Sequence, residues 1–246
     1  MLPLRDSIPR SHKPWMTWAI ILVNALLFAY TVLLDPRAQK AFMYIVGAVP
    51  ARFTHPDWAS EVGFPGGGFL SYFTYMYLHG GFFHFLANMW TMWIFADNIE
   101  DVMGPVRFLV FYTFCGLAAL GVHMFFNPHS PVPVVGASGA IAGVMGAYFL
   151  LYPHSKVLTL IPIFIFPLIV EVPAVVFLGI WFLVQFTSGV SSLSAQAGQG
   201  IAWWAHAGGF VAGMALLWLF RQKDRCKHCS TFTGGQVDGK SKWHRQ

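Results

Sequence analysis

Charged side chains are scarce in this chain, and their scarcity excludes most kinds of soluble protein. Only 10% of the 246 residues are Asp, Glu, Lys or Arg, while 56% are hydrophobic. A soluble domain carries about 25% charged residues. No charged residue lies between Phe108 and Ser155, and only Glu171 interrupts Val157 to Phe220. This excludes a soluble enzyme, a disordered chain and a DNA-binding domain, and it indicates a protein that crosses a membrane several times.

Cysteine is also rare, and the basic residues are unevenly placed. The three cysteines, Cys115, Cys226 and Cys229, do not make a disulfide framework. Of the 15 Lys and Arg residues, 7 lie in the last 26 positions, which fits the positive-inside rule better than a nucleic-acid groove. No cleavable signal peptide is evident, because the first apolar run begins at Trp15 and is long enough to span a bilayer.

Six apolar segments predict an all-α membrane protein, a bundle of six transmembrane helices. A spanning helix needs about 20 apolar residues. The predicted helices cover Trp15–Leu34, part of Phe69–Ala96, Val106–Phe126, Ser138–Tyr152, Pro173–Val190 and Ala202–Phe220. A short cytoplasmic segment, residues 1–14, precedes the membrane domain of residues 15–220. The basic tail, residues 221–246, is predicted to be cytoplasmic and largely disordered.

One stretch, Val157–Val190, is too long for a single crossing and too broken by proline for one helix. We expect Val157–Val172 to be irregular or interfacial, with Glu171 in a capping or interfacial role. Two spans here would give seven crossings. Six crossings instead place 12 Lys and Arg on one side and three on the other, so the positive-inside rule puts both termini in the cytoplasm. This compact layout favours a bacterial inner membrane.

Polar residues inside the predicted spans are functional candidates, because they are costly in lipid. They form three motifs: His79, His84 and Asn88 in the second span, Gly136-Ala137-Ser138-Gly139 at the start of the fourth, and His206, Gly209 and Gly213 in the sixth. His84 and Asn88 are four apart and share a helical face. The predicted topology starts all three helices on the outer side, so it places Ser138, His206, His84 and Asn88 at a similar depth.

The residue types indicate acyl-transfer chemistry. A neutral histidine can take the proton of a serine hydroxyl, which makes His206 the candidate base and Ser138 the candidate nucleophile. An oxyanion needs hydrogen-bond donors, which His84, Asn88 and the backbone N–H of Ser138 at the helix start can supply. No Asp or Glu lies near His206 in the sequence, so we expect a Ser–His dyad rather than a triad.

On these motifs the sequence resembles the rhomboid intramembrane serine proteases, from about Trp15 to Phe220. The resemblance implies that Ser138 and His206 are nucleophile and base, that His84 and Asn88 help to form the oxyanion hole, and that His79 is a structural polar residue. Glu100 and Gly104 also fit the family pattern before the third helix. Many relatives carry an aromatic residue at the position of Ala142, packed on the catalytic imidazole, so we expect Trp203 or Trp204 to orient His206. The first loop carries Arg52 without the Trp-Arg pair of many relatives.

Several of these residues also have a simpler, purely structural interpretation. The glycine pairs Gly139–Gly143 and Gly209–Gly213 are also GxxxG patterns that let membrane helices pack closely, which is the structural role we assign to them. A single serine in a membrane helix usually bonds its own backbone. His79 is expected to make an interhelical hydrogen bond. Cys226 and Cys229 have a zinc-like spacing, but a structural site needs four ligands and His244 is the only further candidate downstream, so we expect neither metal nor cofactor.

Taken together, these residues predict an intramembrane endopeptidase that uses a Ser–His dyad to cut single-pass membrane proteins near the outer leaflet. A helical substrate must unwind first, so Gly or Pro near the cut is expected. Lateral access past the fifth helix and the loop Ser191–Gly200 is expected too. Two alternatives are a non-catalytic relative that binds and escorts membrane proteins, and a small-solute transporter, although no internal repeat supports the latter.

Overall fold

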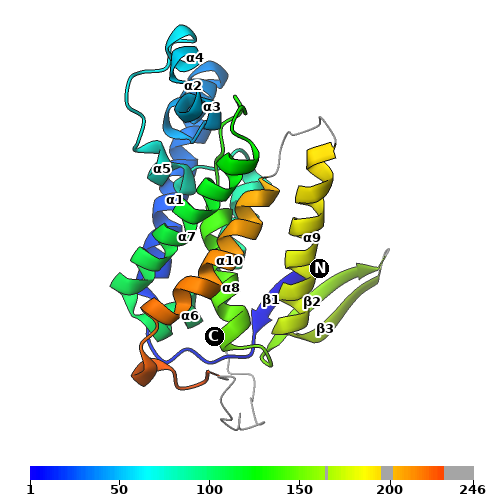
Figure 1. The fold of residues 1–246 in the computed structure, drawn as a ribbon. Helices are drawn as coiled ribbons and strands as arrows, with labels where there is room; N and C mark the ends of the chain where they lie inside the picture. The colour runs from blue at the N-terminus through cyan, green and yellow to red at the C-terminus, as the bar shows by residue number, and fades with distance from the viewer. Residues whose placement is uncertain (164–165, 195–201, 230–246) are drawn as a thin grey trace.

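The computed structural model describes residues 1–163, 166–194 and 202–229 of the chain. Most of them are helical, and three short strands form one small sheet. Six long helices form a bundle in the predicted order (Figure 1): α1 (Trp15–Leu33), α6 (Phe82–Met103), α7 (Pro105–Phe126), α8 (Ser138–Leu151), α9 (Ala174–Ser194) and α10 (Trp203–Phe220). Their ends agree with the prediction to within a few residues, except that α6 begins later and continues to Met103.

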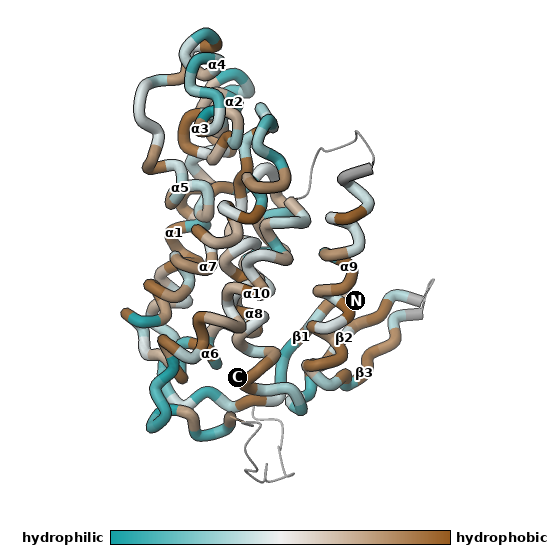
Figure 2. The backbone as a smooth tube through the Cα atoms, viewed as in Figure 1, coloured by the Kyte–Doolittle hydropathy of each residue, from teal (hydrophilic) through white to brown (hydrophobic). Residues whose placement is uncertain are grey.

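Four of these helices are long and apolar enough to cross a membrane, which makes the chain a multi-pass membrane protein. They are Trp15–Leu33, Pro105–Phe126, Ala174–Ser192 and Trp203–Phe220. Helix α6 carries Asp97, Glu100 and Asp101 near its end, and α8 is apolar but has only 14 residues, a rise of about 21 Å. Figure 2 shows hydrophobic residues along the helices and hydrophilic ones at the two ends of the bundle. Six crossings therefore remain a prediction.

A small antiparallel sheet lies at one end of the bundle and corrects the expectation of an all-α protein. Strand β1 (Leu2–Asp6) pairs with β2 (Lys156–Ile163), and β2 pairs with β3 (Phe166–Pro173). The segment that we expected to be irregular is thus a hairpin that leads directly into α9 (Figure 1). Its many β-branched residues favour strands, while its prolines exclude a helix. Glu171 lies on β3 and its carboxylate pairs with Lys156 at 2.5 Å.

Both terminal segments are fastened to the end of α6. The Glu100 carboxylate accepts hydrogen bonds from two backbone N–H groups in the first turn of α1, at 2.9 and 2.8 Å, and so caps that helix. The Asp101 carboxylate accepts a hydrogen bond from the backbone N–H of His12 at 2.8 Å. The backbone carbonyl of Asp101 accepts a hydrogen bond of 2.8 Å from Nε of Arg225, which lies on η2 (Lys223–Arg225). The described parts of both terminal segments therefore lie at one end of the bundle.

The opposite end carries the connection between α1 and α6 (Figure 1), which folds into short helical pieces. These are α2 (Pro36–Val46), α3 (Pro50–Thr54), α4 (Pro56–Glu61), α5 (Ser71–Thr74) and η1 (Tyr75–Tyr77). Arg52 is buried there, donates to the carbonyls of Ile45 at 3.2 Å and Pro65 at 2.9 Å, and lies 5.1 Å from the Phe64 ring. The loop is therefore anchored without a Trp-Arg pair.

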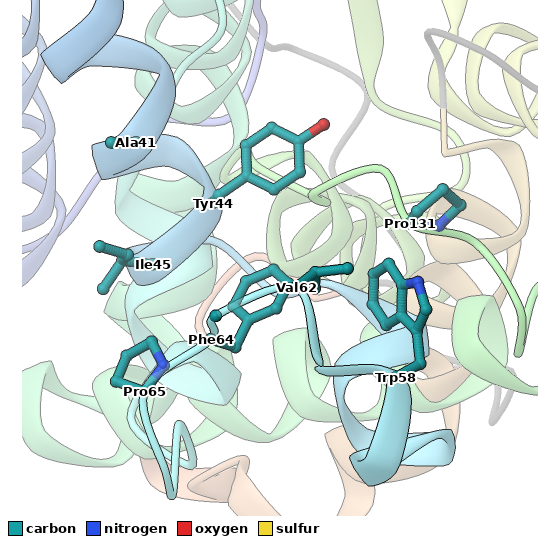
Figure 3. Close-up of a pocket in the computed structure, with 9 residues that line it drawn as sticks. Ala41, Tyr44, Ile45, Trp58, Val62, Phe64, Pro65 and Pro131 are labelled. Carbon is teal, nitrogen blue, oxygen red and sulfur yellow. The ribbon is translucent and has the colours of Figure 1, made fainter. Parts of the chain in front are cut away.

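An apolar cavity of about 340 Å³ lies beside this anchor, with Tyr44, Trp58 and Phe64 among its walls (Figure 3). Neither Ser138 nor His206 lines it. It is therefore separate from the site described next.

Candidate active site

Ser138 and His206 come from two different helices and meet in the interior of the bundle. Ser138 begins α8, and His206 lies in the first turn of α10. Ser138 Oγ and His206 Nε2 are 2.7 Å apart, which is a hydrogen bond. Gly136 forms the turn before Ser138 with a φ of +129°, a conformation that favours glycine, and its N–H donates to the Tyr75 carbonyl at 2.9 Å. The structure thus brings the two predicted reacting side chains into contact.

Glycines let α8 and α10 approach until their backbones touch. A Cβ at Gly209 would overlap the carbonyl oxygen of Gly139, and a Cβ at Gly213 would overlap that of Gly143. Contacts of this kind are typical of small-xxx-small patterns in membrane helices. The glycines therefore serve the site through packing, since a serine and a histidine are short and reach each other only across closely packed helices.

His206 is contacted by two side chains of α9, which was not predicted from the sequence. Its Nδ1 lies 2.7 Å from Gln185 Oε1, and its ring centroid lies 5.9 Å from that of Trp181. Trp204, one of the two candidates for this role, stacks on Phe126 instead, with ring centroids 3.9 Å apart. The side chains that replace the missing aromatic residue at Ala142 thus come from α9.

His84 and Ser138 border the same small space. A Cβ built on Gly136 would lie 2.8 Å from His84 Cε1 and Nε2, and 3.6 Å from Ser138 Oγ. One turn further along α6, Asn88 is buried, and its Nδ2 finds no hydrogen-bond partner among the described residues. A buried amide donor without a partner costs free energy, so Asn88 holds a donor that folding alone does not require.

His79 lies before α6 rather than on it, which corrects its placement within the second helix. It is buried, and within the described ranges neither of its ring nitrogens has a hydrogen-bond partner, so the expected interhelical hydrogen bond is not found. Its ring instead packs at 5.2 Å against His84 and at 5.4 Å against Phe85. His79 therefore supports the position of His84 by ring packing.

The two cysteines with the zinc-like spacing are paired with each other in the structure. Cys226 and Cys229 are joined as a disulfide, and no group of three or more His, Cys, Asp or Glu that could hold a metal occurs among the described residues. Residues 230–246 of the predicted disordered tail, with His244 among them, lie outside the described residues, as do residues 195–200 of the expected lid.

A comparison with family profiles decides the family. The Rhomboid domain profile matches residues 66–223, which is more than half of the chain and includes Ser138, His206, His84 and Asn88. The chain belongs to the rhomboid family. Every rhomboid helix of the site, from α6 to α10, falls within the matched range.

Curated relatives of this rhomboid agree with the family. It is 30% identical over 149 residues to Rhomboid protein 1, mitochondrial, of Saccharomyces cerevisiae, covering 57% of this chain and 38% of that protein. It is 28% identical over 153 residues to RHOMBOID-like protein 1 of Arabidopsis thaliana (54% and 39%). It is 36% identical over 70 residues to Rhomboid protease GluP of Bacillus subtilis (28% and 13%). The rhomboid thus spans less than half the length of each of these three relatives.

Gln185 and Trp181 are the site residues that sequence reasoning missed. The signal for Gln185 was present, because it is an uncharged polar residue inside an otherwise apolar span, and such residues are functional candidates. Nothing in the sequence tells which face of α9 turns toward α10, so the pairing with His206 required the structure.

Proposed function

We propose that this rhomboid is an intramembrane serine endopeptidase that cuts single-pass membrane proteins. The observation that carries the proposal is the 2.7 Å hydrogen bond between Ser138 Oγ and His206 Nε2, formed across two helices in an apolar bundle. A serine that only satisfied its own helix would bond a nearby carbonyl. A serine bonded to an imidazole has a base in place to take its proton.

In the proposed reaction Ser138 Oγ attacks the substrate carbonyl while His206 Nε2 takes the hydroxyl proton. Negative charge then develops on the carbonyl oxygen. The Ser138 backbone N–H, the Asn88 amide and His84 supply donors for it. His206 returns the proton to the leaving amine, and an acyl-enzyme ester remains. Water, deprotonated by His206, attacks this ester, and the proton passes to Ser138 as the acid product leaves.

The proposed membrane arrangement has six crossings, both termini in the cytoplasm and Ser138 below the outer face, in a bacterial inner membrane. Residues 1–14, 15–220 and 221–246 are the three parts of the chain in this proposal. A substrate helix reaches the site sideways, past α9, and unwinds there because all of its carbonyls are otherwise hydrogen-bonded. Helix-weakening Gly or Pro near the cut is therefore expected in substrates. No metal or organic cofactor takes part.

Cleavage of a single-pass test substrate in liposomes tests the proposal. Wild type is expected to cut it, while Ser138→Ala and His206→Ala lose activity by at least about a thousandfold. A fluorophosphonate probe, which reacts with activated serines, should label wild type and not Ser138→Ala. Cleavage by Ser138→Ala at the wild-type rate would contradict the assignment.

The same experiment separates the alternatives. A rhomboid that binds and escorts membrane proteins without cutting them would retain the substrate but leave it intact, and Ser138 would not react with the probe. A solute transporter would show flux into liposomes that persists in Ser138→Ala.

A further inference from the structure

We infer that Gln185 on α9 is a positioning residue for His206, so that the base is correctly oriented only while α9 is packed against α10. This inference rests on the proposed function and concerns the regulation of the same site. It changes the expected Ser–His dyad into a chain of three side chains, Ser138, His206 and Gln185, in which the third member is carried by the helix that substrates must pass.

The hydrogen bonds determine which nitrogen of His206 carries the proton. Gln185 Oε1 is a carbonyl oxygen, so it can only accept, and His206 Nδ1 must therefore be the N–H donor in the 2.7 Å contact. In the neutral ring Nε2 is then left with its lone pair, and Nε2 is the atom 2.7 Å from Ser138 Oγ. The opposite tautomer would place an N–H against the hydroxyl and could not accept its proton.

The environment explains why an amide can serve here in place of a carboxylate. Gln185 is only 7% exposed, and a buried carboxylate would carry a large desolvation cost without a charged partner. The neutral amide fixes the tautomer without that cost. Trp181 lies one turn earlier on the same face of α9 and holds the ring from the side. Ala142 on α8, buried and small, cannot fill this role.

The remaining ring contacts that join α9 to α10 are apolar. Phe182 and Trp181 pack on Phe210 at centroid distances of 4.9 and 6.1 Å, and Phe186 packs on Trp204 at 6.0 Å. Contacts of this kind re-form readily after a displacement because they are non-directional. The hydrogen bond from His206 to Gln185 is directional, so it reports on whether α9 is in place.

The opposite face of α9 is exposed, for example Leu183 at 59% and Val184 at 50%. A substrate that arrives from the lipid must displace this helix or pass beside it. Displacement removes the Gln185 amide from Nδ1, so His206 loses its fixed tautomer until α9 packs again. Proton transfer is thereby coupled to closure of the site around the substrate.

Steady-state cleavage over a range of pH tests this inference with Gln185→Leu, Gln185→Glu and the control Thr187→Val. Thr187 is a polar residue of the same helix, and its hydroxyl donates to the backbone carbonyls of Leu183 and Val184 in that helix, at 2.8 and 3.3 Å. Gln185→Leu should lower kcat by about 10- to 100-fold with a smaller change in KM. Thr187→Val should leave kcat unchanged.

Gln185→Glu keeps the acceptor, so above the acidic limb of its pH profile, where His206 is neutral, it should recover most of the kcat that Gln185→Leu loses. Its carboxylate favours the imidazolium form of His206, so the acidic limb of the pH profile should move to higher pH. The other titratable neighbours that act on His206, His84 from α6 and His123 from α7, are the same in all variants. Their effect therefore cancels in the comparison.

Wild-type kcat and an unshifted pH profile in both Gln185 variants would overturn the inference, and so would a loss in Gln185→Leu that Gln185→Glu does not recover. If Ser138→Ala abolishes cleavage in the same assay, the proposed function stands in either case. If Ser138→Ala still cleaves, the proposed function itself is wrong.

Discussion

Asn88 is one of several buried polar side chains with an unpaired atom among the described residues, and it lies one helical turn beyond His84 on α6. It is 6% exposed, and its amide nitrogen has no hydrogen-bond partner within the described part of the chain. Most buried donors are paired, because an unpaired one loses its hydration without compensation. In the proposed reaction, a donor held free in this way, one helical turn beyond His84, is suited to a group that forms only during the reaction, such as an oxyanion.

Asn88→Ala should therefore reduce activity without reducing stability. We expect kcat to fall about 100-fold, the usual cost of one oxyanion donor, while the free energy of unfolding changes by less than about 1 kcal/mol, since no protein hydrogen bond is lost. Cleavage assays and thermal unfolding in detergent measure the two effects.

Asn24→Ala is the matched control for Asn88→Ala. Asn24 is a buried asparagine on α1 whose amide donates to the Ile20 carbonyl at 2.8 Å. Its replacement should leave kcat unchanged. Equal losses of kcat in the two variants would remove Asn88 from the proposed oxyanion hole.

Among single residues, the sequence can reveal those that are polar within an otherwise apolar span. Ser138, His206, His84 and Asn88 stood out because polar groups are costly in an apolar span. Gln185 is also polar in an apolar span, but its pairing with His206 could not be predicted, because the pairing depends on the rotation of α9 about its axis. Lipid-facing and protein-facing positions of a membrane helix are both apolar, so hydropathy does not determine that rotation.

At the scale of elements, the contact between α8 and α10 is the one on which the site depends. Two glycines of α10 lie directly against backbone carbonyls of α8, at Gly209 with Gly139 and at Gly213 with Gly143. Backbone cannot rotate aside as a side chain can. Any added atom must therefore separate the helices.

Gly213→Ala should lower the free energy of unfolding by about 1–3 kcal/mol, the usual cost of overpacking. It should also lower activity, because separated helices hold Ser138 and His206 beyond hydrogen-bond distance. Gly121→Ala on α7 is the control, since a Cβ at Gly121 meets no atom within 4 Å and alanine favours a helix by up to about 1 kcal/mol. Thermal unfolding and cleavage of both variants check the prediction, which fails if the two behave alike.

The sequence located the helices well and the hairpin badly, for one physical reason. Long apolar runs have few alternatives in a membrane, so their helices are predictable from hydropathy. The segment from Lys156 to Pro173 is apolar too, but its strands are stabilised by pairing with each other and with Leu2–Asp6 at the distant amino terminus. Such long-range pairing leaves no local periodicity to read.

For the whole molecule, Asp6 joins three parts of the chain that are distant in sequence. It lies at the end of β1. Its carboxyl group accepts a hydrogen bond of 2.5 Å from the Tyr148 hydroxyl on α8 and one of 2.7 Å from the Asn98 amide on α6. Burial raises the pKa of Asp6 from its ordinary value of 3.8 to about 7, although the hydrogen bond from Tyr148 opposes this shift. The folded protein therefore favours the protonated carboxyl.

Between pH 4 and pH 7 the folded state binds a proton at Asp6 that the unfolded state has released, so stability falls as the pH rises through this window. The contribution amounts to at most about 4 kcal/mol. Asp6→Asn, which keeps the shape of the side chain and carries no charge, should show a smaller loss of unfolding temperature between pH 5 and pH 8 than wild type. Equal pH dependence in the two proteins would show that Asp6 does not titrate as described.

The length of α8 has a consequence for where a substrate is cut. Its 14 residues rise about 21 Å, while the hydrocarbon core of a bilayer is about 30 Å thick. With its carboxyl end at the inner boundary, close to Lys156, its first residue lies roughly 9 Å beneath the outer boundary. Scission on the proposed topology then falls about six residues inside a substrate's hydrophobic stretch. In thinner bilayers that position would shift toward the aqueous margin, so lipid chain length alone should redistribute the fragments released.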